Sequence, residues 1–318
     1  MFEDFSTFVD QFELILESQD PAFKRIENYR RLFQVKPATE EAKLIDEAIE
    51  SALIRVVKKN WVKFRDDFDS LIKLYNFAPR LAVRTSDSIR RQAFSTPIPI
   101  SALASKLLDC TPESTVYEPT AGMGALLLDA NPKYTQVNEI DHLRAWVLAQ
   151  QEFDQVTSFD ATTWYPDQSF DRVISNPPFG KMKLIGAMKR PYLQYLFPDE
   201  PKLDLKELDE IIPFVALNQL KPDGKAVLII KSVLGSTPEA RMEKYRSNTD
   251  RVKFFDLLFR YYGVTKYLTL GGDLYQKQGA SYPVDLIVID KKEPSNIAKP
   301  NEEVPLYINK YDDLSLIY

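Results

Sequence analysis

The sequence predicts an α/β fold in which a mixed sheet carries helices on both faces and follows an all-helical module. Two observations predict this class. From about residue 91 onward, segments typical of strands alternate with segments typical of helices, which indicates a parallel sheet with helical crossovers. Upstream of residue 91, apolar residues recur at helical spacing and glycine is absent. A chain of 318 residues is long enough for one large domain and a smaller one.

The first 90 residues are expected to form the N-terminal helical module. Residues 2–16 and residues 44–53 carry apolar side chains at helical spacing. Pro37 separates the two runs, and Thr39 followed by two glutamates is a helix-start signal. From residue 55 to residue 91, ten lysines and arginines stand against four aspartates. This basic excess suits either a solvated helix face or a face that contacts phosphates.

Seven segments after residue 91 are predicted strands: residues 115–118, 134–140, 155–159, 172–175, 226–231, 264–270 and 284–290. Helices are expected between most of them, at residues 99–108, 124–128, 143–151 and 208–220. The loop between the last two strands is too short for a crossover helix, so they are expected to form an antiparallel pair at the sheet edge. The fold is then a Rossmann-like sheet of seven strands, in a domain from residue 91 to residue 292. Residues 293–318 are expected to form a C-terminal tail.

Composition excludes several classes of site. Cys110 is the single cysteine, which excludes an internal disulfide and a multi-cysteine zinc site. His142 is the single histidine, which argues against a Ser-His-Asp triad, and we expect no metal site. No apolar run approaches the roughly 20 residues that span a bilayer, and the acidic N-terminus does not have the order of a signal peptide. A cytoplasmic location without membrane contact is expected.

The most informative motif is Asn176-Pro177-Pro178-Phe179, which follows a predicted buried strand. Ligands of open α/β sheets bind at the carboxyl ends of strands. Proline fixes φ and donates no N–H, so carbonyls here are left free to accept hydrogen bonds. The Asn176 carbonyl and a neighbouring main-chain carbonyl can hold both hydrogens of one planar amino group, and Phe179 offers its ring a stacking face. The motif predicts a clamp for an amino group on a flat ring.

A second motif connects the first predicted strand to the segment that follows it: Glu118-Pro119-Thr120-Ala121-Gly122-Met123-Gly124. Its two glycines permit positive φ and close approach of a ligand. Glu139, near the end of the next strand, lies where an acid binds ribose hydroxyls in dinucleotide-type folds. The third glycine of the pyrophosphate pattern is replaced by Leu127, and Glu118 would repel phosphate but attract an ammonium. The pattern predicts a cofactor with a ribose and a positive group.

These motifs resemble those of the class I S-adenosylmethionine-dependent methyltransferases, and among them the DNA adenine-N6 methyltransferases, over roughly residues 94–290. Residues 94–97 are similar to the segment that contacts the methionine part of the cofactor in the gamma arrangement of these enzymes. The resemblance implies a methyltransferase catalytic domain at residues 91–292. The cofactor residues that it implies are Thr96, Glu118, Pro119, Thr120, Ala121, Gly122, Gly124, Glu139, Ile140, Phe159, Asp160 and Asn176. The catalytic residues are Asn176, Pro177, Pro178 and Phe179, and the substrate contacts are Phe179, Lys181, Lys183 and Tyr275.

The implied reaction is transfer of a methyl group from S-adenosylmethionine to the N6 amine of adenine in DNA. Sequence-specific members carry a large recognition domain after the catalytic one, whereas about 28 residues follow Asp290 here. Specificity is then relaxed, or comes from the helical module, from residues 181–210 or from a protein partner, as in a restriction-modification system. The motif also fits enzymes that methylate guanine N2 of ribosomal RNA or a protein glutamine amide. A third alternative is a non-catalytic binding or assembly protein that retains the fold.

Overall fold

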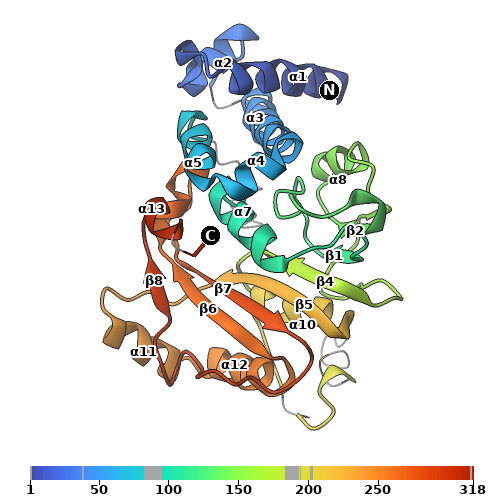
Figure 1. Ribbon diagram of the computed structural model, residues 1–318, viewed down its shortest axis with the longest axis vertical. Helices are drawn as coiled ribbons and strands as arrows, with labels where there is room; N and C mark the ends of the chain where they lie inside the picture. Colours follow the sequence, from blue (N-terminus) through green and yellow to red (C-terminus); the bar gives the residue numbers. More distant parts are fainter. Residues whose placement is uncertain are drawn as a thin grey trace.

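The computed structural model describes residues 2–37, 39–81, 95–182, 193, 195–200, 203–315 and 317–318 (Figure 1). Its first helices are α1 (Phe2–Ser18), η1 (Pro21–Phe23), α2 (Ile26–Leu32), α3 (Glu40–Lys59), α4 (Trp61–Asp66) and α5 (Phe68–Phe77). The helices that follow are α7 (Ile98–Leu108), η2 (Pro132–Tyr134), α8 (His142–Ala149), α10 (Leu208–Asn218), α11 (Pro238–Ser247), α12 (Thr249–Tyr261), η3 (Gly272–Gln278) and α13 (Tyr311–Leu314). The strands are β1 (Val116–Glu118), β2 (Thr135–Asn138), β3 (Gln155–Thr157), β4 (Phe170–Ser175), β5 (Leu220–Lys231), β6 (Val264–Leu270), β7 (Val284–Asp290) and β8 (Leu306–Ile308).

The strands form one mixed sheet in the order β3-β2-β1-β4-β5-β7-β6-β8, which confirms the predicted α/β fold. The five strands from β3 to β5 in this order pair in parallel. β7 runs antiparallel to both of its neighbours, β5 and β6. The antiparallel pairing predicted for the last two of the seven strands is therefore confirmed.

The predicted number of strands was wrong, because the sheet in the described part of the chain has eight. The additional strand, β8, lies in the segment expected as a tail and pairs in parallel with β6, with Ile308 opposite Leu270. Of its three residues only Ile308 is buried, so the local pattern carries almost no strand signal. Pairing with β6 makes it a strand, and β8 rather than β6 forms the edge.

Side chains alternate between two cores, one on each face of the sheet. Val227 and Ile229 of β5 lie in the core that also contains the N-terminal helices and α7. Leu228 and Ile230 lie in the second core with α10 and α12. A strand buried on both faces reads as a continuous apolar run, as β5 does. Helices thus cover both faces of the sheet (Figure 1).

The N-terminal helices pack directly onto the sheet domain. The Trp61 indole N–H donates to the Asp129 carboxylate at 2.6 Å. The Lys277 ammonium donates to the carbonyls of the last turn of α5 and of Ala78. Thr39 caps α3 by accepting from the Ala42 N–H, as its start signal predicts. No helix within the described ranges is long and apolar enough to cross a membrane.

Gly272 permits a close approach between the start of η3 and the segment before β7. A Cβ at this position would lie 2.1 Å from the Ser281 carbonyl oxygen. We expect Gly272→Ala to lower the free energy of unfolding by about 3 kcal/mol, the upper part of the range for overpacking. Gly122→Ala is the matched comparison: its Cβ meets no atom within 4 Å, but φ is +57°, so a loss of about 1–2 kcal/mol is expected. Urea unfolding compares the two, and equal losses would contradict the steric explanation.

A cluster of buried charges fixes α10 against α12 and β5. Asp209 and Glu210 of α10 are fully buried and face Arg251 of α12. The Asp209 carboxylate also accepts from the Lys231 N–H, at the end of β5, at 2.9 Å. These contacts join the carboxyl end of β5 to the helices behind it.

Stability is expected to depend on pH through Glu210, because its burial raises its pKa to about 7. An acid whose pKa rises on folding stabilises the fold below its unfolded pKa, and this stabilisation is lost as pH rises through the folded value. We expect a loss of about 2–3 kcal/mol from this group between pH 4.5 and pH 7. Glu210→Gln should lack this part of the pH dependence. Urea unfolding of both proteins across that range measures it, and parallel pH profiles would refute it.

Candidate active site

The loops that follow β1, β2, β3 and β4 meet at the carboxyl edge of the parallel part of the sheet. β1 ends at Glu118, β2 at Asn138, β3 at Thr157 and β4 at Ser175. Because these four strands are parallel neighbours, the motif that follows β4 and the glycine loop that follows β1 lie side by side. The sheet thus brings together the two motifs that the sequence singles out.

Asn176 is held by residues from two other segments. Its Nδ2 donates to the Thr96 hydroxyl at 2.6 Å, and the Thr120 hydroxyl donates to its main-chain carbonyl at 3.5 Å. The bond to Thr96 fixes which way the amide faces. Within the described ranges no group donates to Asn176 Oδ1 or to the Pro177 carbonyl. Both acceptors that the clamp requires are therefore without a donor among the residues that the structure describes.

The remainder of the clamp is anchored by the segment before α10. The Leu208 N–H donates to the Gly180 carbonyl at 2.7 Å, and the Met182 N–H donates to the Lys206 carbonyl at 2.8 Å. Phe179 is half-buried against the core, and Lys181 is exposed. Lys183, expected to contact substrate, lies outside the described residues.

The glycine loop has the backbone that its sequence predicts, with φ of +57° at Gly122 and +83° at Gly124. The helix predicted at residues 124–128 was wrong, because this segment forms turns. Residues 125–128 are buried on every side, so they have no polar face for a surface helix. The Ser105 hydroxyl donates to the Leu126 carbonyl at 2.7 Å, in place of a helical partner.

Glu139 holds the glycine loop in place. Its carboxylate accepts from the Gly122 N–H and from the Asp141 N–H, both at 2.8 Å. Burial raises the pKa of Glu139, and Arg144 and these hydrogen bonds act in the opposite direction. The neighbouring Ile140 is 54% exposed, so it presents an apolar surface at the mouth of the site.

The residues after β3 form a second side of the site. The Asp160 carboxylate accepts from the N–H and the hydroxyl of Thr162, at 2.9 Å and 2.6 Å. The Phe159 ring is 50% exposed and lies 4.8 Å from the Trp164 ring, centroid to centroid. An exposed aromatic ring at the end of β3 suits stacking on a flat ring.

Asn138 connects the ends of three strands, and the sequence reasoning missed it. Its Nδ2 donates to the carbonyls of Pro119 and Phe159, and its Oδ1 accepts from the Thr157 hydroxyl and the Phe159 N–H. All four distances lie between 2.9 and 3.0 Å. An asparagine at the end of a buried strand is the signal that could have indicated it, because a buried amide must be satisfied.

Lys58 is the second residue that sequence reasoning missed, since it counts there only as part of a basic run. It extends from α3 so that its ammonium is buried, 4.8 Å from the centroid of the Phe153 ring. It interacts electrostatically with Glu118, which is itself 1% exposed. Neither the Lys58 ammonium nor Glu118 Oε2 has a hydrogen-bond partner in the described part of the chain.

Tyr275 does not lie where a substrate ring could stack on it. It is 3% exposed, and its side chain belongs to the core that contains α5 and α7. A buried ring presents no free face, so Tyr275 is left out of the proposed site.

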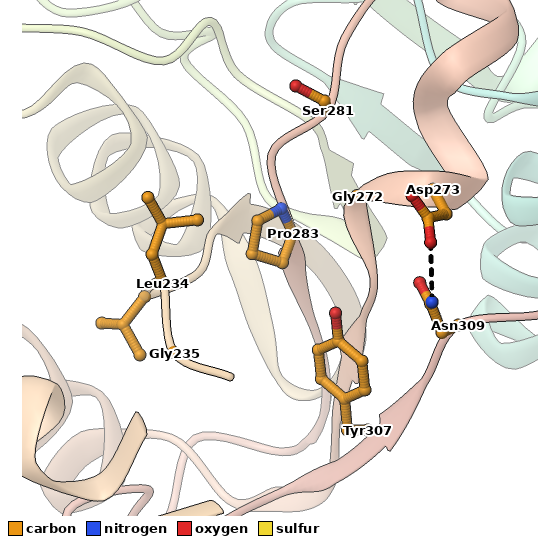
Figure 2. A pocket seen from close by; sticks show the side chains of 9 residues that line it. Leu234, Gly235, Gly272, Asp273, Ser281, Pro283, Tyr307 and Asn309 are labelled. Atoms are coloured by element: carbon orange, nitrogen blue, oxygen red, sulfur yellow. Dashed lines mark hydrogen bonds between the residues drawn. The ribbon is translucent and has the colours of Figure 1, made fainter. Parts of the chain in front are cut away.

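A separate cavity of about 180 Å³ lies beyond β5, towards β8. Figure 2 shows its lining, with Leu234 on one side, Asp273 and Asn309 on the other, and the Tyr307 ring below. The Asn309 amide donates to the Asp273 carboxylate at 2.8 Å. No residue expected to bind cofactor or substrate lines this cavity.

No protein-family model and no curated protein matches the chain. Solved structures do. A protein of Listeria monocytogenes assigned to the class I S-adenosylmethionine-dependent methyltransferases matches 99% of this chain and 95% of its own, at 12% identity and a TM-score of 0.52. A protein of Vibrio vulnificus YJ016 described as the modification subunit of a type I restriction enzyme matches 92% of this chain and 60% of its own, at 12% identity and a TM-score of 0.54. The methyltransferase subunit of a type I restriction-modification system of Streptococcus thermophilus matches 91% and 60%, at 14% identity and a TM-score of 0.50.

The chain has a class I methyltransferase fold. At sequence identities of 12% to 14%, the likeness to these three proteins shows a shared fold and does not extend to their activities. The chain spans nearly all of the Listeria protein and about 60% of the two restriction-modification subunits.

Proposed function

We propose that this protein is an S-adenosylmethionine-dependent methyltransferase that acts on the N6 amine of adenine in DNA. The observation that carries the proposal is the fixed amide of Asn176: neither its Oδ1 nor the Pro177 carbonyl accepts a hydrogen bond from any described residue. These acceptors lie at the end of β4, next to the glycine loop that follows β1. Two acceptors at one place match the two hydrogens of a planar amine.

The residues around the glycine loop fit the proposed cofactor. The positive φ of Gly122 and Gly124 lets a ligand approach the backbone. The exposed rings and chains of Phe159 and Ile140 suit the adenine of a nucleoside. The buried, unpartnered Glu118 Oε2 suits an ammonium. S-adenosylmethionine, when bound, would supply an electrophilic methyl group on a sulfonium.

The chain's own residues then prepare the amine. Asn176 Oδ1 and the Pro177 carbonyl each accept one hydrogen, which favours a pyramidal nitrogen with its lone pair available. Positive charge that develops on this nitrogen is stabilised by the two carbonyl dipoles, which are already oriented. Thr96 preserves that orientation through its bond to Asn176 Nδ2. Phe179 stacks on the target base after the base has left the duplex.

Recognition of the DNA sequence is proposed to lie outside the catalytic domain. The proposed division is the helical module at residues 1–90, the catalytic domain at residues 91–292 and the terminal segment that supplies β8. Two proteins with this fold are described as subunits of restriction-modification systems and are longer than this chain. We infer that the protein works with a partner chain that contributes DNA specificity, with Lys181 among its own DNA contacts.

Methyl transfer from labelled S-adenosylmethionine, offered in parallel to duplex DNA, single-stranded DNA, RNA and protein, tests the proposal. We expect label in DNA, recovered as N6-methyladenine after nucleoside digestion. Label in RNA or protein would overturn the DNA assignment in favour of guanine N2 or a glutamine amide. Cofactor binding without transfer to any polymer would favour a binding or assembly protein.

A further inference from the structure

The N-terminal helical module places one charged side chain in the candidate cofactor site. Lys58 lies in the last turn of α3, and Glu118 is the last residue of β1. Both charged groups are buried, and each has an atom without a hydrogen-bond partner within the described ranges. They interact through space, but no carboxylate oxygen of a described residue lies within 4.0 Å of the Lys58 ammonium. Two buried groups of opposite charge therefore lie near each other without direct contact.

Two buried charged groups that are not in contact lower the stability of the fold. Desolvation of each charge costs several kcal/mol, and only direct contact with good geometry offsets that cost. Burial accordingly raises the pKa of Glu118 well above its usual range and lowers that of Lys58 to about 8. A merely structural pair would be expected to close into a salt bridge, so two buried and unpartnered groups of opposite charge indicate a ligand that binds both.

The two charges restrict the chemistry of that ligand. A phosphate would be repelled by Glu118, and a simple cation by Lys58. A neutral group would leave both charges unpaired. A group with an ammonium and a carboxylate on adjacent atoms satisfies both, as in a free α-amino acid.

The position of Lys58 is fixed by a second set of contacts between α3 and the site. Glu47 and Glu50 lie on the same face of α3 and interact electrostatically with Arg144 of α8. Arg144 also interacts with Glu139, which holds the glycine loop. The Ser95 hydroxyl, next to Thr96, donates to the Glu50 carboxylate at 2.6 Å. These contacts anchor α3 along the site from Ser95 to the glycine loop.

We propose that Lys58 and Glu118 together form a subsite for an α-amino-acid group, in which Lys58 binds the carboxylate and Glu118 the ammonium. This proposal rests on the proposed function, because the methionine part of S-adenosylmethionine carries such a group. In this proposal the helical module contributes a residue, Lys58 of α3, to the cofactor site.

The test is the affinity of full-length variants for two product-like ligands, measured by isothermal titration calorimetry. S-adenosylhomocysteine carries the amino-acid group, and 5′-methylthioadenosine does not. Lys58→Met should lower the affinity for S-adenosylhomocysteine by about 10- to 100-fold, the equivalent of one charge-assisted hydrogen bond. It should change the affinity for 5′-methylthioadenosine less than about twofold. Lys59→Met is the matched control, because Lys59 is the next residue but is exposed and paired with Glu13, and it should change neither affinity.

Two further comparisons separate the explanations. Lys58→Arg keeps the charge and should retain most of the affinity for S-adenosylhomocysteine. Wild-type protein should bind decarboxylated S-adenosylhomocysteine as weakly as Lys58→Met binds the intact compound, and this comparison does not require a variant to fold. If Lys58→Met lowered the affinity for both nucleosides equally, or changed neither affinity, the subsite would be overturned and the proposed function would stand. Wild-type protein that binds neither nucleoside would overturn both.

Discussion

Asn176→Ala is expected to abolish methyl transfer, with a fall in rate of about 1,000-fold or more, while S-adenosylhomocysteine binds within about threefold of wild type. The amide contributes one of the two acceptors for the amine, and removal of a single pre-oriented polar group from such a site costs about 100- to 1,000-fold. Thr96 loses its hydrogen bond from Nδ2 in the same variant, which adds to the loss. The effect falls on the chemical step because the amide contacts the amine rather than the nucleoside of the cofactor.

Single-turnover methylation of DNA and calorimetric binding of S-adenosylhomocysteine measure the two halves of this prediction. Asn131→Ala is the matched control: Asn131 precedes β2 at the opposite edge of the sheet, and its amide donates to the Pro112 carbonyl. It should leave the rate unchanged. Turnover near the wild-type rate in Asn176→Ala would show that the clamp is not the catalytic device.

Thr96→Val extends the same reasoning to the orientation of the amide. It removes the hydroxyl that accepts from Asn176 Nδ2 but keeps the Asn176 side chain. We expect a loss of rate of about 10-fold, the equivalent of one hydrogen bond, smaller than that of Asn176→Ala. A rate equal to wild type would show that the amide is held by other groups.

Arg251→Leu is expected to lower the free energy of unfolding by about 3–5 kcal/mol, the cost of leaving a buried charge without its partner. Arg251 donates to Asp209 and lies 3.4 Å from a carboxylate oxygen of Glu210. Asp209 is 0% exposed, so water cannot replace the guanidinium. A loss of this size is a large part of the stability of a typical domain.

Urea unfolding at pH 7 measures this loss against a matched variant. Arg260 forms an ion pair with Glu200 at 2.8 Å, but both side chains are exposed, so Arg260→Leu should cost less than about 1 kcal/mol. Because both variants replace an arginine of an ion pair by leucine, the difference between them measures the effect of burial. Similar losses at the two positions would show that burial of the cluster is not what makes it stabilising.

Local patterns in the sequence were sufficient for most of the sheet and for the two central motifs. The strand segments 264–270 and 284–290 coincide with β6 and β7, because a short apolar and β-branched run and a short loop are properties of a few consecutive residues. The positive φ of Gly122 and Gly124 follows equally from the residue type. The motif at Asn176 predicted free carbonyl acceptors because proline removes N–H donors from its own segment.

Only the tertiary structure decided the features that depend on contacts between distant segments. β8 exists because β6 offers it an edge, and residues 124–128 form turns in which the Leu126 carbonyl accepts from the distant Ser105 hydroxyl. Burial of Tyr275 in the core removed it from the site, whereas α3 brought Lys58 to Glu118. The sequence determined which backbone conformations and hydrogen-bonding groups each segment offers. Which of these groups meet depends on how the apolar surfaces pack, and that is set by the whole chain rather than by neighbouring residues.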